Sequence, residues 1–287
     1  MTTKRSSYVF VTVCLAALLI VSMFVAGCTS NGTTASTAAS PAATSTTAGA
    51  AATQAAVPAT SAPVTTAVAT TSAQKQSITI TGSTTVLPIA QAAADAYMKL
   101  HPEANIQISG GGSGVGIQSI GAKTVDIGMS SRDVTSAEKA KYPDFNIVTV
   151  AHDGIAVIVN PQNSIQYITL DQVKGIYTGK ITKWSEISGA DVPNTNNQIV
   201  LIGRDSASGT RSYFDETVLK NANLSKNMLE QNSNGAVAQS VAQTPGAIGY
   251  VSIGFVSSDV KALPIWYNAN KIISPSVDTV KNKTYPV

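Results

Sequence analysis

The chain has 287 residues, of which 44% are hydrophobic and 12% charged, and its formal net charge is +3. Two of the 19 Lys and Arg residues lie within the first seven positions, so the remaining chain is near +1 against its 16 acidic residues. A charge so close to balance argues against a nucleic-acid-binding protein. The two cysteines, Cys14 and Cys28, leave no disulfide and no thiolate metal site after position 28.

The first 28 residues have the organisation of an export signal. Lys4 and Arg5 precede the apolar stretch 8–26, and Gly27 stands directly before Cys28. This order is typical of a secretory signal, and it resembles the lipobox of surface lipoproteins, in which Cys28 becomes the lipidated first residue. An uncleaved anchor is the alternative, because the apolar stretch is just long enough to span a bilayer. Both interpretations place the following chain outside the cytoplasm, at the cell surface or in a periplasm, tethered to the membrane.

Residues 29–76 are predicted to form a disordered tether. From position 29 to 74 there is no charged and no aromatic residue, and Ala, Thr and Ser dominate. Such a segment cannot bury enough apolar surface to offset the entropy of ordering the chain. As a random coil it would span roughly 35–40 Å and hold the following domain clear of the membrane.

From Ser77 onwards, strand patterns alternate with helix patterns. The periodicity predicts strands at 77–81, 105–108, 125–129, 155–159, 198–202, 247–251 and 261–265, with a further extended piece after Ile147. It predicts helices at 87–100, through 117–120, from 135, from 170, near 184 and from 208. Thr135 and Glu138 match a capping box. Alternation of this kind predicts an α/β fold with parallel sheets.

Four polar turns follow the carboxyl ends of predicted strands. They comprise residues 83–85, 110–114, 130–132 and 206–210. Ligands of open α/β sheets bind at such strand ends. One Gly- and Ser-rich turn is a common loop, but four of them in two distant halves of the sequence predict a ligand held between two lobes.

The turn at 206–210 has the chemistry of an oxyanion site. Ser208 and Gly209 stand at a predicted helix start, where backbone N–H groups are free and the helix dipole is positive. Arg204 precedes them with a planar fork suited to oxyanions, and Arg is otherwise used after position 28 only at Arg132 and Arg211. A small anion such as phosphate fits this turn. The alternative is an ordinary capped helix with two surface arginines.

Six stretches, taken in order, resemble the phosphate-binding proteins of phosphate ABC importers, the Pst type. They are GSTTVLP (82–88), GGSG (111–114), DIGMSSR (126–132), DGIAVIVN (153–160), YTGKITKW (177–184) and SGTR (208–211). The resemblance runs from about Ser77 through Tyr250. It implies a two-lobed periplasmic-binding-protein fold of type II, each lobe a mixed, mostly parallel sheet flanked by helices.

That resemblance also implies the domain plan and the partners. Residues 77–155 and 255–287 would form lobe 1, and 156–254 would form lobe 2, with hinges near 155–160 and 250–255. The lobes would capture inorganic phosphate and deliver it to the permease subunits of an ABC importer. We expect a monomer that uses no cofactor or metal and is not an enzyme.

The matched motifs and polar turns give the expected phosphate ligands. They are Ser83, Thr84, Thr85, Ser113, Ser131, Arg132, Asp153, Arg204, Ser208, Gly209 and Thr210.

One position departs from the family pattern. Family members with a longer pattern place an Asp after the Asp-x-Gly strand, and here Ser130-Ser131-Arg132 follows it. A carboxylate there accepts the proton of phosphate and repels sulfate, which brings only lone pairs. Asp153 is the expected substitute, and Asp205 is the next candidate. Alternatively, Asp153 caps a backbone turn and Asp205 pairs with Arg204.

Three alternative functions differ from phosphate transport in the residues that they require. A hydrolase lacks support, because neither Ser113 nor Ser208 lies in a Gly-x-Ser-x-Gly elbow and the two histidines, His101 and His152, are isolated. A binder of sulfate, molybdate or tungstate would share the fold and the donors, so only the acceptor separates it from a phosphate binder. A surface receptor or adhesin would keep the fold but lose the donor turns.

Overall fold

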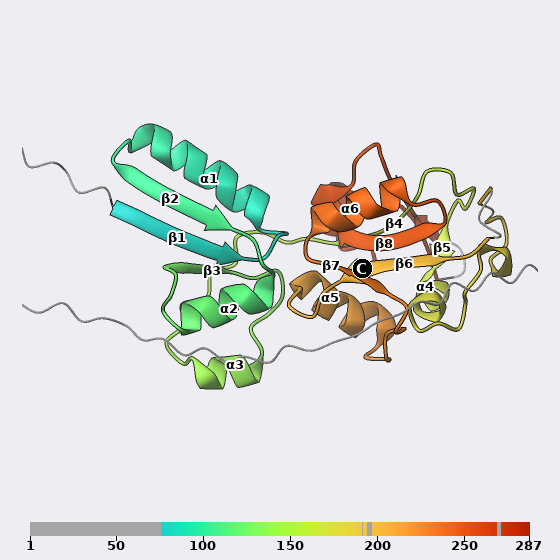
Figure 1. Cartoon of the computed structure of the whole chain (residues 1–287), viewed down its shortest axis with the longest axis horizontal. Coiled ribbons are helices and arrows are strands. Elements are labelled where there is room, and N and C mark those ends of the chain that lie inside the picture. The colour runs from blue at the N-terminus through green and yellow to red at the C-terminus, as the bar shows by residue number, and fades with distance from the viewer. Residues whose placement is uncertain (1–75, 191, 194–196, 269–270) are drawn as a thin grey trace, which may run out of the picture. The chain divides into compact units, whose positions relative to one another are not determined.

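The computed structural model describes residues 76–190, 192–193, 197–268 and 271–287 (Figure 1). The predicted export signal at 1–28 and the predicted tether lie outside the described residues, except for Gln76, where the first strand begins. The described elements fall into two groups. We call residues 76–154 the first lobe and residues 155–287 the second lobe.

The first lobe is built on a parallel sheet of three strands in the order β2-β1-β3. Its elements are β1 (Gln76–Gly82), α1 (Leu87–Leu100), β2 (Ala104–Ser109), α2 (Ser113–Gly121), β3 (Ile127–Met129) and α3 (Ser136–Lys141). Helix α1 packs on β2, and α2 packs on β1 and β3 (Figure 1). Thr81 pairs with Ser109, and Gly82 with Met129, so all three strands end at one edge of the sheet.

Gly82 is required where α2 meets this sheet. Its φ is +136°, and an added Cβ would overlap Met129 O and lie 2.9 Å from Gly116 Cα. Only glycine adopts this conformation without strain and permits so close an approach. The start of α2 is thereby held beside the carboxyl end of β1.

The second lobe contains a mixed sheet of five strands in the order β7-β6-β8-β4-β9. These strands are β4 (Ile155–Val159), β6 (Val200–Arg204), β7 (Leu229–Gln231), β8 (Ala247–Ser252) and β9 (Lys261–Ala262). Strand β6 is parallel to β7 and β8, whereas β4 is antiparallel to β8 and β9. Every residue of β4 is buried, as its continuous β-branched sequence predicts for a strand covered on both faces.

Helices cover the two faces of this sheet. The helical elements are α4 (Leu170–Tyr177), η1 (Trp184–Glu186), α5 (Gly209–Phe214), η2 (Asp215–Leu219), α6 (Asn234–Gln243), η3 (Ile253–Phe255) and α7 (Val277–Lys281). Helix α6 packs on β4, β6 and β8 (Figure 1). The second lobe has two hydrophobic cores, one of them beneath α6. The other contains a cluster of aromatic rings, in which Tyr250 stacks on Phe214 and meets Tyr177 edge-on.

Residues 255–287 were expected in lobe 1; in the structure, parts of this segment join the second-lobe sheet and core, and its end also meets Gly154. Strand β10 (Ile265–Tyr267) joins β5 (Ile168–Thr169) and β11 (Lys271–Ile273) in a small sheet. Leu263 and Ile265 are fully buried in the same core as Trp184. Burial of these two side chains is the physical reason for the placement, because apolar contact area decides where a short segment packs.

Most predicted elements are present, and the differences are local. The predicted strand at 261–265 is split into β9 and β10 at Pro264, which cannot donate to a strand ladder. No strand is assigned at 147–150, where extended structure was expected. Helix α6 was not predicted, although Ser233 precedes Val237 and Val241 at the spacing of one helical face.

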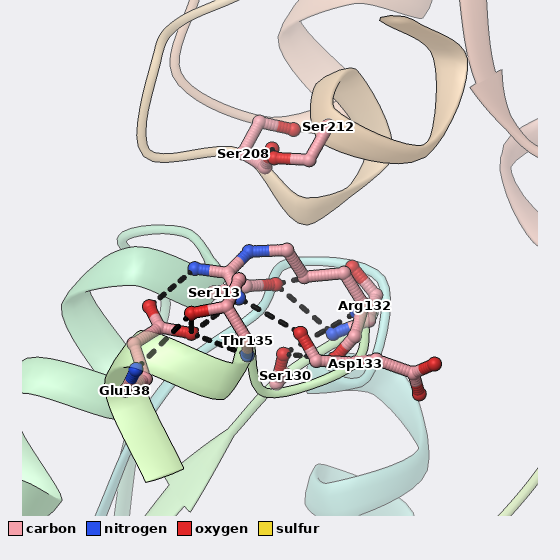
Figure 2. Close-up of polar contacts among 9 residues, drawn as sticks. Ser113, Ser130, Arg132, Asp133, Thr135, Glu138, Ser208 and Ser212 are labelled. Carbon is pink, nitrogen blue, oxygen red and sulfur yellow. Dashed lines mark hydrogen bonds and ion pairs between the residues drawn. The ribbon is translucent and has the colours of Figure 1, made fainter. Parts of the chain in front are cut away.

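The predicted capping box at Thr135 is confirmed and extends to Arg132. The side chain of Glu138 accepts the N–H of Thr135, and Thr135 caps the N–H of Glu138. The guanidinium of Arg132 donates to both oxygens of that carboxylate, at 2.8 and 2.7 Å (Figure 2). The hydrogen bonds from Arg132 lower the pKa of Glu138 to about 2, helped by those from Thr135.

Trp184 provides a test of the second-lobe core. Its ring is fully buried, and its Nε1 donates to Gly246 O at 2.9 Å. We expect Trp184→Phe to lower the free energy of unfolding by about 1–3 kcal/mol, through the lost hydrogen bond and the space left behind. Urea denaturation followed by circular dichroism measures this change. Trp266 is 40% exposed, and Trp266→Phe should stay within about 0.5 kcal/mol. Equal effects would contradict the packing described.

Glu138 provides a pH test. Its pKa is lower in the folded chain than in the unfolded chain, so the unfolded state binds more protons and stability falls as the pH drops from 4.5 towards 2. Allowing for solvent screening, we expect Glu138→Gln to remove about 1 kcal/mol of stability at neutral pH and almost none near pH 2. Urea titrations across this range measure the difference, with the exposed carboxylate variant Glu216→Gln as control. A pH-independent effect of Glu138→Gln would count against the Arg132 pair.

Candidate functional site

The three strand ends of the first lobe gather polar turns at one place. Ser113, the first residue of α2, is fully buried. Its Oγ accepts the N–H of Ser131 at 2.9 Å and lies 3.3 Å from Ser131 Oγ. The turn after β3 is therefore fastened to the start of α2, which brings together two of the predicted donor turns.

The turn after β1 adds Ser83, Thr84 and Thr85. Ser83 Oγ accepts the backbone N–H groups of Thr85 at 3.2 Å and Val86 at 3.4 Å, so this buried hydroxyl fixes the shape of the turn. Thr85 Oγ1 lies 3.1 Å from Thr210 Oγ1. The turn thus contacts the second lobe through a threonine hydroxyl.

Helix α5 of the second lobe begins against the first lobe. Ser208 is its N-cap, and its Oγ accepts the N–H of Arg211. The N–H groups of Gly209 and Thr210 lie in the first helical turn, where no carbonyl of the helix can accept them. A Cβ on Gly209 would overlap Ser113 Oγ and lie 2.8 Å from Ser131 Oγ. Gly209 therefore permits the helix start to approach the serine donors.

A backbone hydrogen bond joins the same two turns. The N–H of Gly114 donates to Ala207 O at 2.9 Å. Gly112 has a φ of +92°, and an added Cβ there would lie 2.7 Å from Ala207 O. The start of α2 and the start of α5 are thus in direct contact.

Arg204 is the most unusual side chain of the site. It is 1% exposed, and its Nε and Nη2 donate to Gln231 O and Asn232 O, both at 3.3 Å. Its Nη1 is buried and has no hydrogen-bond partner. Burial lowers the pKa of Arg204 below its ordinary value, because desolvation disfavours the charge. A buried cation with an unused donor is costly unless an anion meets it.

The other two arginines have different roles. Arg211 Nη1 donates to Arg204 O at 2.9 Å and to Glu230 at 2.6 Å, so it braces the strand that carries Arg204. Arg132 directs both terminal nitrogens to Glu138, and Figure 2 shows this pair beside Ser113 and Ser130. The alternative of two surface arginines does not describe Arg204, which is buried.

The two candidate acceptors differ in their surroundings. Asp153 is exposed as a residue, yet burial of its carboxyl group raises the pKa of this side chain. Hydrogen bonds from the Ser252 side chain and from two backbone N–H groups act in the opposite direction and lower the pKa. Asp205 accepts the N–H of Ala207 at 3.1 Å. Among the described residues, no ion pair joins Asp205 to Arg204 within 4.0 Å. Asp205 therefore shapes its own turn.

Asn234 is a site residue that the sequence analysis missed. It is fully buried at the start of α6, and its Nδ2 donates to Thr85 Oγ1 at 2.9 Å and Thr84 Oγ1 at 3.3 Å. Its Oδ1 accepts the N–H of Ser252 at 3.1 Å. Recognition of α6 from Ser233 would have placed Asn234 at a fifth polar turn, the one after β7.

The described residues contain neither a cluster of metal-ligating side chains nor a membrane-spanning helix. Within 76–190, 192–193, 197–268 and 271–287, no group of three or more His, Cys, Asp or Glu side chains could hold a metal ion. In the same ranges, none of the helices has the length and apolar character to cross a bilayer.

Comparison with known proteins identifies the family to which this chain belongs. Residues 33–287 match the model of a family described as the PBP superfamily domain. The phosphate-binding protein PstS of Bacillus subtilis is 36% identical over 214 residues, which are 74% of this chain and 67% of that protein. The chain thus spans about two thirds of the length of this curated relative.

Solved structures agree with the sequence match. A protein from Clostridium perfringens, described as a phosphate ABC transporter substrate-binding protein with bound phosphate, is 35% identical with a TM-score of 0.67, covering 74% of this chain and 83% of that one. An ABC-type phosphate transport receptor from Vibrio cholerae is 32% identical with a TM-score of 0.55, covering 73% and 82%. The fold is thus the mixed α/β, type II periplasmic-binding-protein fold. This chain belongs to the PBP superfamily and, within it, to the Pst-type phosphate-binding proteins.

Proposed function

We propose that this chain captures inorganic phosphate between the turns of its two lobes and delivers it to the permease of an ABC importer. The observation that carries the proposal is the buried Nη1 of Arg204, which has no acceptor. The first turns of α2 and α5, which contact each other, contribute hydroxyl and backbone N–H donors that we assign to the same anion. A tetrahedral oxyanion supplies the acceptors that such a set requires.

The proposed ligand set is narrower than the one expected from the sequence. We assign hydrogen-bond donation to the anion to Thr84, Thr85, Ser113, Ser131, Arg204, Gly209 and Thr210, and we propose Asp153 as the acceptor of the phosphate proton. Ser83 and Ser208 hold their turns through backbone hydrogen bonds, and Arg132 is engaged by Glu138. In our proposal the side chains of these three residues hold the shape of the site and do not bind the anion directly.

The relatives support the ligand and the transport role. The Bacillus subtilis relative is named as phosphate-binding, and the Clostridium perfringens relative holds phosphate. We propose that this chain likewise acts by binding, as a monomer and without catalysis. We further propose that it is exported, and tethered to the outer side of the cell membrane through Cys28 or an N-terminal anchor.

Release of phosphate requires the two lobes to separate. The bonds between Gly114 and Ala207 and between Thr85 and Thr210 are few and polar, so opening would expose little apolar surface. We propose that the hinge lies where the chain passes from the first lobe to the second, at the start of β4. Phosphate would then favour the closed arrangement by bridging donors from both lobes.

Arg204 gives the direct test of this function. In calorimetric titrations of the full chain in mild detergent, we expect phosphate to bind and sulfate and molybdate to bind much more weakly. Arg204→Lys should weaken phosphate binding at least about 30-fold, or about 2 kcal/mol, because an ammonium cannot keep the two carbonyl bonds and also reach the anion.

Arg132→Lys is the matched comparison. Because Arg132 faces Glu138, we expect its phosphate dissociation constant to change less than about threefold. Equal losses in both variants would remove Arg204 from its central role. A wild-type chain that prefers sulfate or molybdate would assign the site to a different oxyanion.

Asp153 tests how the site accepts the proton of phosphate. Its carboxyl group is hydrogen-bonded to Ser252, whose backbone N–H donates to Asn234 in the site, and burial raises the pKa of Asp153, so that its carboxylate accepts a proton more readily than an ordinary aspartate. We therefore expect Asp153→Asn to reduce the ratio of phosphate to sulfate affinity about tenfold or more, with a smaller change in sulfate affinity alone. Competition titrations at neutral pH measure the ratio. An unchanged ratio in Asp153→Asn, together with a reduced ratio in Asp205→Asn, would move the acceptor to Asp205.

A further inference from the structure

We propose that Asn234 is a positioning residue that makes the threonine hydroxyls of the first lobe donate towards the bound anion. This inference rests on the proposed function and assigns a role that the donor turns alone do not provide. Asn234 belongs to the second lobe, whereas Thr84 and Thr85 belong to the first.

The orientation of the Asn234 amide follows from its partners. The backbone N–H of Ser252, 3.1 Å from Oδ1, can only donate, so the atom that faces it must be the amide oxygen. The amide nitrogen consequently faces Thr85 Oγ1 at 2.9 Å and Thr84 Oγ1 at 3.3 Å. Full burial of Asn234 leaves no water to exchange for these partners.

This orientation fixes the polarity of the two hydroxyls. A threonine hydroxyl can donate one hydrogen and accept at its lone pairs, and alone it rotates to suit its neighbours. Because Asn234 Nδ2 donates to each Oγ1, both threonines accept on that side. Their hydroxyl hydrogens must point elsewhere, and Thr85 lies 3.1 Å from Thr210 Oγ1, at the start of α5.

The consequence is a preference for ligands that accept hydrogen bonds. With the hydroxyl hydrogens turned away from Asn234, the turn after β1 can donate towards the first turn of α5, where Thr210 lies beside Thr85 and where our proposal places the anion. Preorganised donors stabilise an anion because no reorientation is needed when it binds. The polarity also depends on both lobes, since the amide and the hydroxyls come from opposite sides of the site.

An aspartate at this position would reverse the effect. One carboxylate oxygen could still accept the N–H of Ser252, but the other would accept the threonine hydroxyl hydrogens and draw them away from the anion. Only the threonine side chains would separate its negative charge from phosphate, so the two charges would repel each other. Substitution by aspartate should thus be more harmful to binding than removal of the amide.

The test compares Asn234→Ala and Asn234→Asp with Asn160→Ala in the full chain, by calorimetric titration with inorganic phosphate. Asn160 is the matched control, because it is 3% exposed and its Nδ2 donates to Val241 O and Ala242 O at the other end of α6. Both alanine variants should lose similar stability in urea. We expect phosphate affinity to fall about tenfold in Asn234→Ala and at least about 100-fold in Asn234→Asp. In Asn160→Ala it should change less than about threefold.

A second arm separates positioning from a general structural role. In a background that carries both Thr84→Val and Thr85→Val, Asn234→Ala should weaken phosphate binding less than about threefold further, because both hydroxyls that Asn234 orients are already gone. An undiminished tenfold loss in that background would overturn the inference, as would wild-type affinity in Asn234→Ala.

Failure of the inference and failure of the proposed function give different results. Wild-type phosphate binding with unaffected Asn234 variants overturns the role of Asn234 and leaves the function standing. A folded wild-type chain that binds no phosphate overturns the proposed function and this inference together.

Discussion

A guanidinium that is buried and incompletely paired is the constraint on which the site depends. The guanidinium of Arg204 donates to two carbonyls at the end of β7, those of Gln231 and Asn232. Its backbone N–H donates to the Tyr250 hydroxyl, and its carbonyl accepts from Arg211. These contacts fix its direction and leave Nη1 without an acceptor. Desolvation makes this arrangement unfavourable in the absence of an anion and correspondingly favourable in its presence. The aromatic cluster of Tyr250, Phe214 and Tyr177 thus supports the site, because it holds the hydroxyl that positions Arg204.

The fold supplies the remaining donors through the geometry of parallel strands. Strands β1, β2 and β3 end at one edge, so serines and threonines that are far apart in sequence become neighbours there. Ser113 and Ser131 show this directly, since 18 positions separate them and a 2.9 Å hydrogen bond joins them. Glycines at positions 82 and 209 then remove the side chains that would keep these turns apart. The site is therefore made of small residues around one large cation.

The sequence was most informative where local chemistry decides the structure. The capping box of Thr135, the buried strand β4 and the polar turns follow from short patterns and are present. Long-range partners could not be predicted in this way. Arg132 was predicted as a ligand, its guanidinium pairs with Glu138, and we propose that it shapes the site. Asn234 was missed because its partners, Thr84 and Thr85, lie about 150 positions away. The C-terminal segment was placed in lobe 1 by family analogy, and in the structure Leu263 and Ile265 of that segment are buried in the second-lobe core.

The central claim is that an anion completes the hydrogen bonding of Arg204. A crystal structure of the full chain grown with phosphate tests it most directly. The account predicts a phosphate oxygen within about 3 Å of Arg204 Nη1, with the carbonyl bonds to Gln231 and Asn232 retained and further oxygens at Ser113 and the first turn of α5. A phosphate bound elsewhere, or bound here while Nη1 still lacks an acceptor, would contradict it.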